Sequence, residues 1–419
     1  MDELEASSIY VNTKLMKKSS QPLPRLNSAD ILSSRRYTIA LLLCSLPALQ
    51  EFEISNKSEA NFCCSESAST LDNSFEEEWD LSALKELWSP REMVPKELEI
   101  SKNINLDNWK VITMLGEGAQ STVYLWKDMV TDYKFALKVW DKRKLKKHTK
   151  ICCIYREMEV LESAKHPFIV ELLGHFENEK YVWMALELWR AGDLFYHLKK
   201  LRKDEGKTFS EDTAKFYIAC IILAIEKLHS EGVIYRDLKP ENILINSDGY
   251  IKLCDMGLCI HQEGVNLKNC RQQRGSKEFF APEIVRREMY DYNVDWWSLG
   301  ILAYEIFEGH TPFCDDNVFM EQKSIRNSEV KFDKSNLSSD CKDFIMQLLD
   351  KSKHTRLGAG GVDEIKAHPW LNNVDWEGIL NKEVVAPYDP KVEYMPDTHY
   401  FDSEFTKNKV LRHLTYFTK

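Results

Sequence analysis

The sequence predicts an α+β fold in which a small β-rich lobe with one main helix precedes a larger α-helical lobe. Three strand-like runs come first, at residues 109–115, 121–126 and 134–140. Residues 151–164 follow with apolar side chains at helical spacing, and longer helical patterns come later, including residues 211–229. Because the strands are grouped before most of the helices, the two kinds of element are expected to form successive lobes.

Length, charge and cysteine content set the broad class. The chain has 419 residues, 43% hydrophobic and 29% charged, which suits a globular enzyme with extensions. Most of its net charge of -10 lies in the first 108 residues, which hold 11 basic and 18 acidic side chains. No nucleic-acid partner is expected, because such binding requires a basic face. The 11 cysteines lack zinc-site spacing, which indicates free thiols in a reducing compartment.

Residues 1–108 are predicted to be an N-terminal extension that is largely disordered or regulatory. They are rich in Ser, Asn and Glu and carry no motif that we can assign. Residues 75–88 form a candidate amphipathic helix, for packing on the rest of the chain or for docking a regulatory partner. The apolar run 38–49 is shorter than the ~20 residues of a membrane span, so a covered helix is favoured over membrane association.

A glycine-rich turn joins the first two predicted strands. Glycines two positions apart let a backbone approach phosphates without Cβ clashes. The pattern also suits an ordinary hairpin turn, and Ser121 replaces the third glycine of G-x-G-x-x-G. The turn therefore indicates a nucleotide site only in company with other motifs. Its candidate nucleotide-binding residues are Leu115, Gly116, Glu117, Gly118 and Val123.

A lysine lies within the third predicted strand, in the run Phe-Ala-Leu-Lys that ends at Lys138. This run matches the V-A-I-K strand of phosphoryl-transfer enzymes. An ammonium group amid apolar neighbours needs anionic partners, which ATP phosphates and Glu157 of the predicted helix can supply. The alternative is a lysine whose charge simply reaches out to water.

The most specific motif is residues 235–242, Tyr-Arg-Asp-Leu-Lys-Pro-Glu-Asn. It reproduces the catalytic loop H-R-D-x-x-x-x-N with tyrosine at the first position. Phosphoryl transfer needs an oriented hydroxyl, a metal and neutralised phosphate charge. Asp237 can accept the proton of a hydroxyl, Lys239 can lie beside the transferring phosphate, and Asn242 can hold magnesium.

The triplet Asp255-Met256-Gly257 stands where D-F-G belongs, shortly after a strand-like run. Asp255 is the expected second magnesium ligand, because Mg²⁺ prefers oxygen and few protein ligands. Methionine replaces phenylalanine but is also apolar and adaptable, so the packing role is kept. The alternative is an exposed aspartate in a turn.

Together these motifs resemble the eukaryotic protein kinase superfamily over residues 109–371, with the lobes dividing near residue 187. Ala281-Pro282-Glu283 and the helix start at Asp295 are further matches, and the resemblance pairs Glu283 with Arg356. It implies transfer of the γ-phosphoryl group of ATP, with Mg²⁺, to protein hydroxyls. By the same resemblance the ATP site also includes Ala136, Lys138, Glu187 and Asp255.

Within the superfamily the chain resembles the AGC group, which includes cyclic-nucleotide-dependent kinases and protein kinase B. The catalytic loop begins Tyr-Arg-Asp, and residues 372–419 are similar to the C-terminal tail of the group. In that tail Phe401 is expected to help cover the adenine of ATP. Leucines replace phenylalanines in the faint hydrophobic motif at 411–416, so this end either docks on the small lobe or frays.

The resemblance also bears on the substrate. Lys239 after Asp237 is the serine/threonine pattern. Acidic residues fall at positions where basophilic members bind substrate arginine, and carboxylates bind guanidinium groups in forked pairs. Basic residues are therefore expected about two or three positions before the phosphoacceptor. The alternative is that these acids cap helices or pair internally. They are Asp193, Glu241 and Glu305.

Residues 255–275 contain no Ser, Thr or Tyr. By the resemblance, Gln272 occupies the position whose phosphate pairs with the arginine before the catalytic aspartate, here Arg236. Glutamine can form hydrogen bonds but carries no charge. We therefore expect a kinase that does not use activation-loop phosphorylation, and that is either constitutively competent or held by its extension or a partner. Ser276 is expected to contact the catalytic loop and the substrate.

Two function classes remain open at this stage. An active kinase is favoured, acting on protein substrates as a cytoplasmic monomer with access to the nucleus. A kinase-like scaffold is the alternative, because Ser121, Met256 and Gln272 depart from the family pattern. None of these departures removes a chemical group that catalysis needs. The catalytic positions that are filled are Lys138, Glu157, Asp237, Lys239, Asn242 and Asp255.

Overall fold

The computed structural model describes most of the chain after residue 108. The N-terminal extension lies outside the described residues, as do Gln272, Phe401 and the hydrophobic motif at 411–416. The described stretches are residues 109–118, 120–145, 148–261, 273–332 and 337–392.

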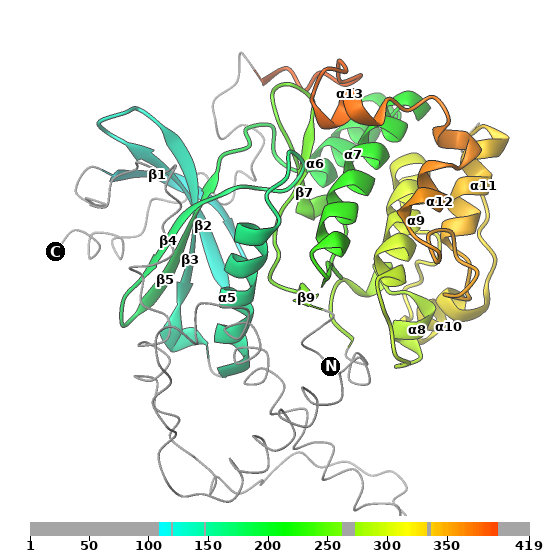
Figure 1. The fold of residues 1–419 in the computed structure, drawn as a ribbon, viewed down its shortest axis with the longest axis horizontal. Coiled ribbons are helices and arrows are strands. Elements are labelled where there is room, and N and C mark those ends of the chain that lie inside the picture. Colours follow the sequence, from blue (N-terminus) through cyan, green and yellow to red (C-terminus); the bar gives the residue numbers. More distant parts are fainter. Residues whose placement is uncertain (1–108, 119, 146–147, 262–272, 333–336, 393–419) are drawn as a thin grey trace, which may run out of the picture. The chain divides into compact units, whose positions relative to one another are not determined.

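A five-stranded antiparallel sheet comes first in the described chain (Figure 1). The three strands predicted from the sequence are confirmed, and each runs slightly further than predicted. The spatial order β1-β2-β3-β5-β4 places β3 at the centre, paired with β2 and β5. The strands are β1 (Trp109–Glu117), β2 (Ser121–Asp128), β3 (Lys134–Asp141), β4 (Leu172–Glu177) and β5 (Tyr181–Glu187).

The two faces of this sheet have different surroundings because side chains alternate along a strand. Phe135, Leu137 and Val139 of β3 join an aromatic-rich cluster on one face. Lys138 and Trp140 lie on the other face, where Trp140 packs with residues of helix α5 (His148–Ser163). The predicted helix is confirmed as α5. The alternation thus places Lys138 on the face of the sheet that α5 covers.

The larger lobe is helical, and its core is built around α7 and α9. Almost every side chain of α9 is buried, as are most of those of α7. The second predicted helix is confirmed as α7. The helices are α6 (Leu194–Lys200), α7 (Glu211–Ser230), α8 (Pro282–Val285), α9 (Asn293–Glu308), α10 (Val318–Asn327), α11 (Ser339–Leu348), α12 (Val362–Lys366) and α13 (Trp376–Leu380). No helix within the described ranges is long and apolar enough to cross a membrane.

Four short strands bracket the motifs of the helical lobe. They are β6 (Val233–Ile234), β7 (Ile243–Ile245), β8 (Ile251–Leu253) and β9 (Ile260–His261). β6 pairs with β9, and β7 pairs with β8, both antiparallel. The catalytic-loop motif lies between β6 and β7, and the Asp-Met-Gly triplet lies between β8 and β9. The strand pairs therefore bring these two motifs to the same end of the helical lobe.

Candidate active site

The catalytic loop has an unusual backbone conformation at Arg236, where φ is +69°. A positive φ is uncommon for a residue with a side chain, and it persists when surrounding contacts enforce it. The fully buried carboxylate of Asp295 in α9 accepts hydrogen bonds from the backbone N–H groups of Tyr235 (2.9 Å) and Arg236 (2.8 Å). Helix α9 thereby fixes the turn that presents the next residue, Asp237.

Asp237 is the centre of a dense polar network. Its carboxylate accepts hydrogen bonds from Asn242 Nδ2 (2.9 Å) and from the N–H (3.1 Å) and Oγ–H (3.2 Å) of Ser276. Lys239 Nζ lies 3.0 Å from Asp237 Oδ2 and donates to Ser276 Oγ at 3.1 Å. The structure thus brings together four predicted site residues from the loop and the segment before α8.

A second polar cluster joins the sheet to the helical lobe. Lys138 Nζ lies 2.6 Å from Glu157 Oε1 in α5 and 3.0 Å from Asp255 Oδ1. Burial alone would lower the pKa of Lys138, but the charges of Asp255 and Glu157 outweigh it and hold the pKa above its usual value. Burial also raises the pKa of Glu157, although Lys138 opposes this shift. The lysine is therefore a fixed positive charge.

Asp255 combines a constrained backbone with an accessible carboxylate. Its φ is +57°, and its side chain is 48% exposed. The charge of the Lys138 ammonium holds the pKa of Asp255 below its usual value, although partial desolvation of the carboxylate opposes this shift. The next residue, Met256, is fully buried, so the packing role expected at this position is kept. A charged carboxylate is thus available beside the lysine.

The donor set of the catalytic loop and the triplet fits a magnesium ion. Asn242 uses its amide NH₂ group on Asp237, which leaves its carbonyl oxygen for another partner. Asp255 uses Oδ1 on Lys138, which leaves Oδ2. Mg²⁺ is bound in proteins by one or two such oxygen ligands together with substrate phosphates and water. Asn242 and Asp255 are the residues that could hold it.

The glycine-rich turn between β1 and β2 leaves open space. Among the described residues no atom lies within 4 Å of a Cβ built on Gly116, and the nearest to one on Gly118 is Ser121 O at 3.6 Å. Neither glycine has a left-handed φ. These glycines would therefore help to bind a phosphate because they lack a Cβ and let the backbone come close to it, and not because they adopt a special conformation.

The other predicted nucleotide residues lie along the same sheet. In the strand register Val123 pairs with Lys138, and Ala136 pairs with Leu186, so these positions adjoin the lysine. Leu115 in β1 is buried. The Glu187 carboxylate is already engaged, because it accepts a hydrogen bond from Glu171 N (2.7 Å) and forms an ion pair with Lys252.

The three predicted substrate carboxylates differ in their surroundings. Asp193 caps α6 by accepting from Tyr196 N at 2.8 Å, and burial raises its pKa to about 6. Glu241 is exposed. In the described part of the chain, Glu305 Oε2 is buried without a hydrogen-bond partner. Burial, with the nearby charges of Glu241 and Glu278, raises the pKa of Glu305 to about 7. Glu305 is the carboxylate most in need of a cation.

Two residues contact the catalytic loop in ways that the sequence did not predict. One is Asp295, whose capping of the loop backbone needs the fold to be known. The other is Tyr290, which is buried and whose hydroxyl accepts a hydrogen bond from Arg236 Nη1 at 2.8 Å. Arg236 Nε donates to the carbonyl oxygen of Leu258 at 2.7 Å. No motif around Tyr290 signals this contact, because its partner is 54 positions away.

Comparison with known proteins agrees with this geometry. The protein kinase domain family matches residues 109–371. The serine/threonine-protein kinase sck2 of Schizosaccharomyces pombe is 37% identical over 73% of this chain and 47% of its own length. The cAMP-dependent protein kinase type 3 of Saccharomyces cerevisiae is 34% identical over 73% of this chain and 75% of its own length.

A third relative has a similar relation to the chain. The RAC serine/threonine-protein kinase of Drosophila melanogaster is 35% identical over 74% of this chain and 50% of its own length. The chain spans between 47% and 65% of the length of three curated relatives, which are sck2, a second kinase of Schizosaccharomyces pombe and one of Dictyostelium discoideum. The chain belongs to the protein kinase family and, within it, to the AGC group of serine/threonine kinases.

Proposed function

We propose that the chain is an active kinase that transfers the γ-phosphoryl group of ATP to serine or threonine hydroxyls of proteins. The observation that carries this proposal is the network around Asp237, in which Asn242, Ser276 and Lys239 contact its carboxylate through donor groups. These donors hold the carboxylate in one orientation, from which it can accept the proton of a substrate hydroxyl. A scaffold that only binds partners would have no need of this arrangement beside a charged Lys138–Asp255 pair.

Each residue then has a role in the transfer. Asp237 orients the acceptor hydroxyl and takes its proton as the oxygen forms a bond to the γ-phosphorus. The bond from that phosphorus to the β–γ bridging oxygen breaks, and ADP leaves. Lys239 neutralises charge on the transferring group, and Lys138 binds the phosphates while Glu157 holds it in place. Magnesium, when bound by Asn242 and Asp255, would neutralise further phosphate charge.

The proposal includes competence without an activation-loop phosphate. The Arg236 guanidinium is held by two neutral acceptors, the Tyr290 hydroxyl and the Leu258 carbonyl. Among the described residues these contacts orient the arginine without an anion, which agrees with the absence of Ser, Thr and Tyr from residues 255–275. A phosphate on the activation loop, which pairs with this arginine in other kinases, would therefore not be needed to orient Arg236.

The proposal also includes a preference for basic residues upstream of the phosphoacceptor. Glu305 supports it most, because a buried carboxylate without a hydrogen-bond partner in the described chain gains from an incoming guanidinium group. Glu241 adds negative charge nearby. Asp193 contributes less, because its carboxylate already caps α6.

Several expectations about the whole chain stay proposals. Residues 1–108 are proposed to be a regulatory or disordered extension that can engage a partner. Residues 372–419 are proposed to form an AGC-type tail, with Phe401 covering the adenine. We further propose a monomer that works in the cytoplasm with access to the nucleus.

Substitution of Asp237 tests the proposed function directly. Asp237→Asn removes the proton acceptor and keeps the size of the side chain, so kcat for a serine peptide should fall ~100-fold or more. Binding of MgATP, measured by titration, should stay within about twofold because Asp237 contacts the hydroxyl and not the nucleotide. Equal turnover by the variant and the parent chain would refute the role of Asp237. Absence of turnover in both, with MgATP bound, would favour the scaffold.

A further inference from the structure

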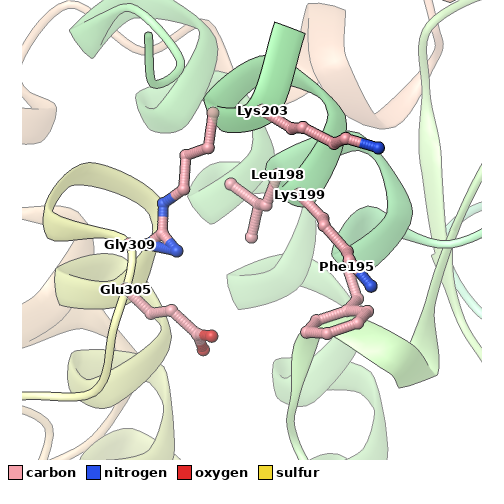
Figure 2. A pocket seen from close by; sticks show the side chains of 7 residues that line it. Phe195, Leu198, Lys199, Lys203, Glu305 and Gly309 are labelled. Carbon is pink, nitrogen blue, oxygen red and sulfur yellow. The ribbon is translucent and has the colours of Figure 1, made fainter. Parts of the chain in front are cut away.

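A pocket of about 480 Å³ lies in the helical lobe, beside the candidate substrate carboxylates. Figure 2 shows the carboxylate of Glu305 on one side and the side chains of Phe195, Leu198 and Lys199 on the other. We call it the upstream pocket. It is formed by α6, the π-helical turn Leu201–Glu205 that follows it, and the end of α9. Its lining residues are Phe195, Leu198, Lys199, Arg202, Lys203, Glu305 and Gly309.

The upstream pocket is divided by charge. Glu305 contributes one carboxylate, and Lys199, Arg202 and Lys203 contribute three exposed cations. Within the described residues none of these three cations forms an ion pair with a carboxylate. The pocket therefore has one negative wall and a positive rim with a net positive charge. A substrate that carries only basic residues would be attracted by the Glu305 carboxylate and repelled by the positive rim.

Arg202 is placed against the backbone of Gly309, the residue that ends α9. Gly309 has a φ of +75°, and a Cβ built on it would lie 1.5 Å from Arg202 Nη2. Gly309 leaves room for the guanidinium, and its left-handed φ would strain any residue with a side chain. The contact brings the cation into the wall of the pocket near Glu305, close enough for its charge to lower the pKa of that carboxyl against the opposing effect of burial.

The order of these groups gives the direction of the substrate. Glu241 lies one residue before Asn242 in the catalytic loop, and its charge acts on Glu305. Arg202 and Lys199 line the pocket together with Glu305, whereas Glu241 does not line it, so Glu305 is the carboxylate that both groups adjoin. A chain leading away from the phosphoacceptor would therefore meet the carboxylates first and the cations afterwards.

We propose that the upstream pocket binds an acidic side chain of the substrate, placed further from the phosphoacceptor than the basic residue that Glu305 binds. The inference rests on the proposed kinase function and deepens it, because it names a bipartite substrate in which an acidic residue precedes a basic one. Lys199 and Arg202 bind the carboxylate. Charge-assisted hydrogen bonds of this kind are about twice as strong as neutral ones.

Peptide kinetics with the full chain provide the test. The parent peptide carries basic residues shortly before a serine and alanine elsewhere. Variants carry a single Glu at one of the positions ~4 to 8 residues upstream. At about 3.3 Å per residue, an extended chain places these positions about 13–26 Å from the phosphoacceptor. At one position the Glu peptide should exceed its alanine counterpart about tenfold in kcat/KM, mainly through KM. The ratio should shrink with added salt, because the cations are exposed.

Charge reversal identifies the residues that bind. In the double variant Lys199→Glu and Arg202→Glu, the ratio for the Glu peptide should fall below one, and a Lys peptide should become the better substrate. Lys180→Glu makes the same kind of change on an exposed lysine in the β4–β5 turn, away from the pocket, and should leave the ratio unchanged.

Two results would overturn the inference. One is a ratio near one at every position in the parent chain. The other is a ratio that survives the double reversal. Failure of the proposed basic preference would look different, because peptides with and without the basic residues would then be phosphorylated equally well. A phosphoserine at the Glu position should bind more tightly still, since its charge is about twice as large.

Discussion

Tyr290 is the residue whose hydroxyl accepts a hydrogen bond from Arg236 Nη1. Tyr290→Phe removes that hydroxyl and leaves Arg236 Nη1 without its acceptor in a mostly buried site. A hydrogen bond to a charged group contributes about 1.5–3 kcal/mol, so we expect kcat to fall roughly tenfold. Peptide phosphorylation at saturating ATP measures this change. An unaltered kcat would show that the orientation of Arg236 does not depend on Tyr290.

A matched variant separates orientation from packing. Tyr133 is an exposed tyrosine in the turn between β2 and β3, and Tyr133→Phe makes the same chemical change away from the site. It should leave kcat as it is. If both variants lose activity to the same extent, the effect at Tyr290 is not specific to the contact with Arg236.

Glu305 should make substrate binding depend on pH. Burial and the charges of Glu241 and Glu278 raise the pKa of Glu305 to about 7. The carboxyl is charged above that pH and becomes neutral below it, so it loses its attraction for arginine in acid. KM for arginine-containing peptides should therefore rise as the pH falls from about 8 to about 6. Glu305→Gln should show a high KM at both pH values, and a pH effect that persists in this variant would contradict the assignment.

At the scale of elements, the ion pair between α8 and the segment after α11 stabilises the helical lobe. Arg356 donates two bonds to Glu283, at 2.7 and 2.9 Å, and both side chains are almost fully buried. Removal of one partner leaves a buried charge, so Glu283→Ala should lower the free energy of unfolding by ~3–5 kcal/mol. Chemical denaturation measures this loss.

An exposed pair nearby serves as the control. Arg286 and Glu288 lie 4.0 Å apart and are partly exposed. Such pairs contribute about 0–1 kcal/mol, so Arg286→Ala should hardly change the free energy of unfolding. A loss for Glu283→Ala no larger than that of the control would mean that the buried pair does not hold the two elements together.

Local patterns predicted the elements that carry the chemistry. The periodicity of β3 and α5 placed Lys138 and Glu157 on facing elements, and the catalytic-loop motif placed Asp237 with Asn242. Such features depend on residues close together in the chain. Periodicity also gave α7, because its buried face repeats at the helical period. The strand ends were less well defined, since a ladder can continue beyond the apolar run that predicts it.

Contacts between distant segments could not be predicted in this way. The loop-fixing role of Asp295 and the contact of Tyr290 with Arg236 depend on how α8 and α9 pack behind the catalytic loop. The capping of α6 by Asp193 was one of two alternatives that the sequence left open, and the structure shows that this carboxylate does cap the helix. The upstream pocket likewise depends on the packing of α6 and the turn after it against the end of α9, which brings Arg202 to Gly309.

At the scale of the whole molecule, two clusters from different parts of the chain form one site. Lys138 of the sheet reaches Asp255 of the helical lobe, 117 positions further along, and Asp237 lies with Asn242 and Ser276. The contacts that assemble the site use no activation-loop phosphate, because residues 255–275 contain no Ser, Thr or Tyr that could carry one. This is the physical basis for expecting that the kinase is competent as it is synthesised.

Turnover by the full chain, shown to be free of phosphate by intact mass, is the most direct test of that claim. With MgATP and a serine peptide carrying upstream arginines, we expect steady transfer at a rate within the usual range of kinases, about 1–100 s⁻¹. Activity that begins only after the chain has been phosphorylated, or no transfer although MgATP binds, would contradict the account.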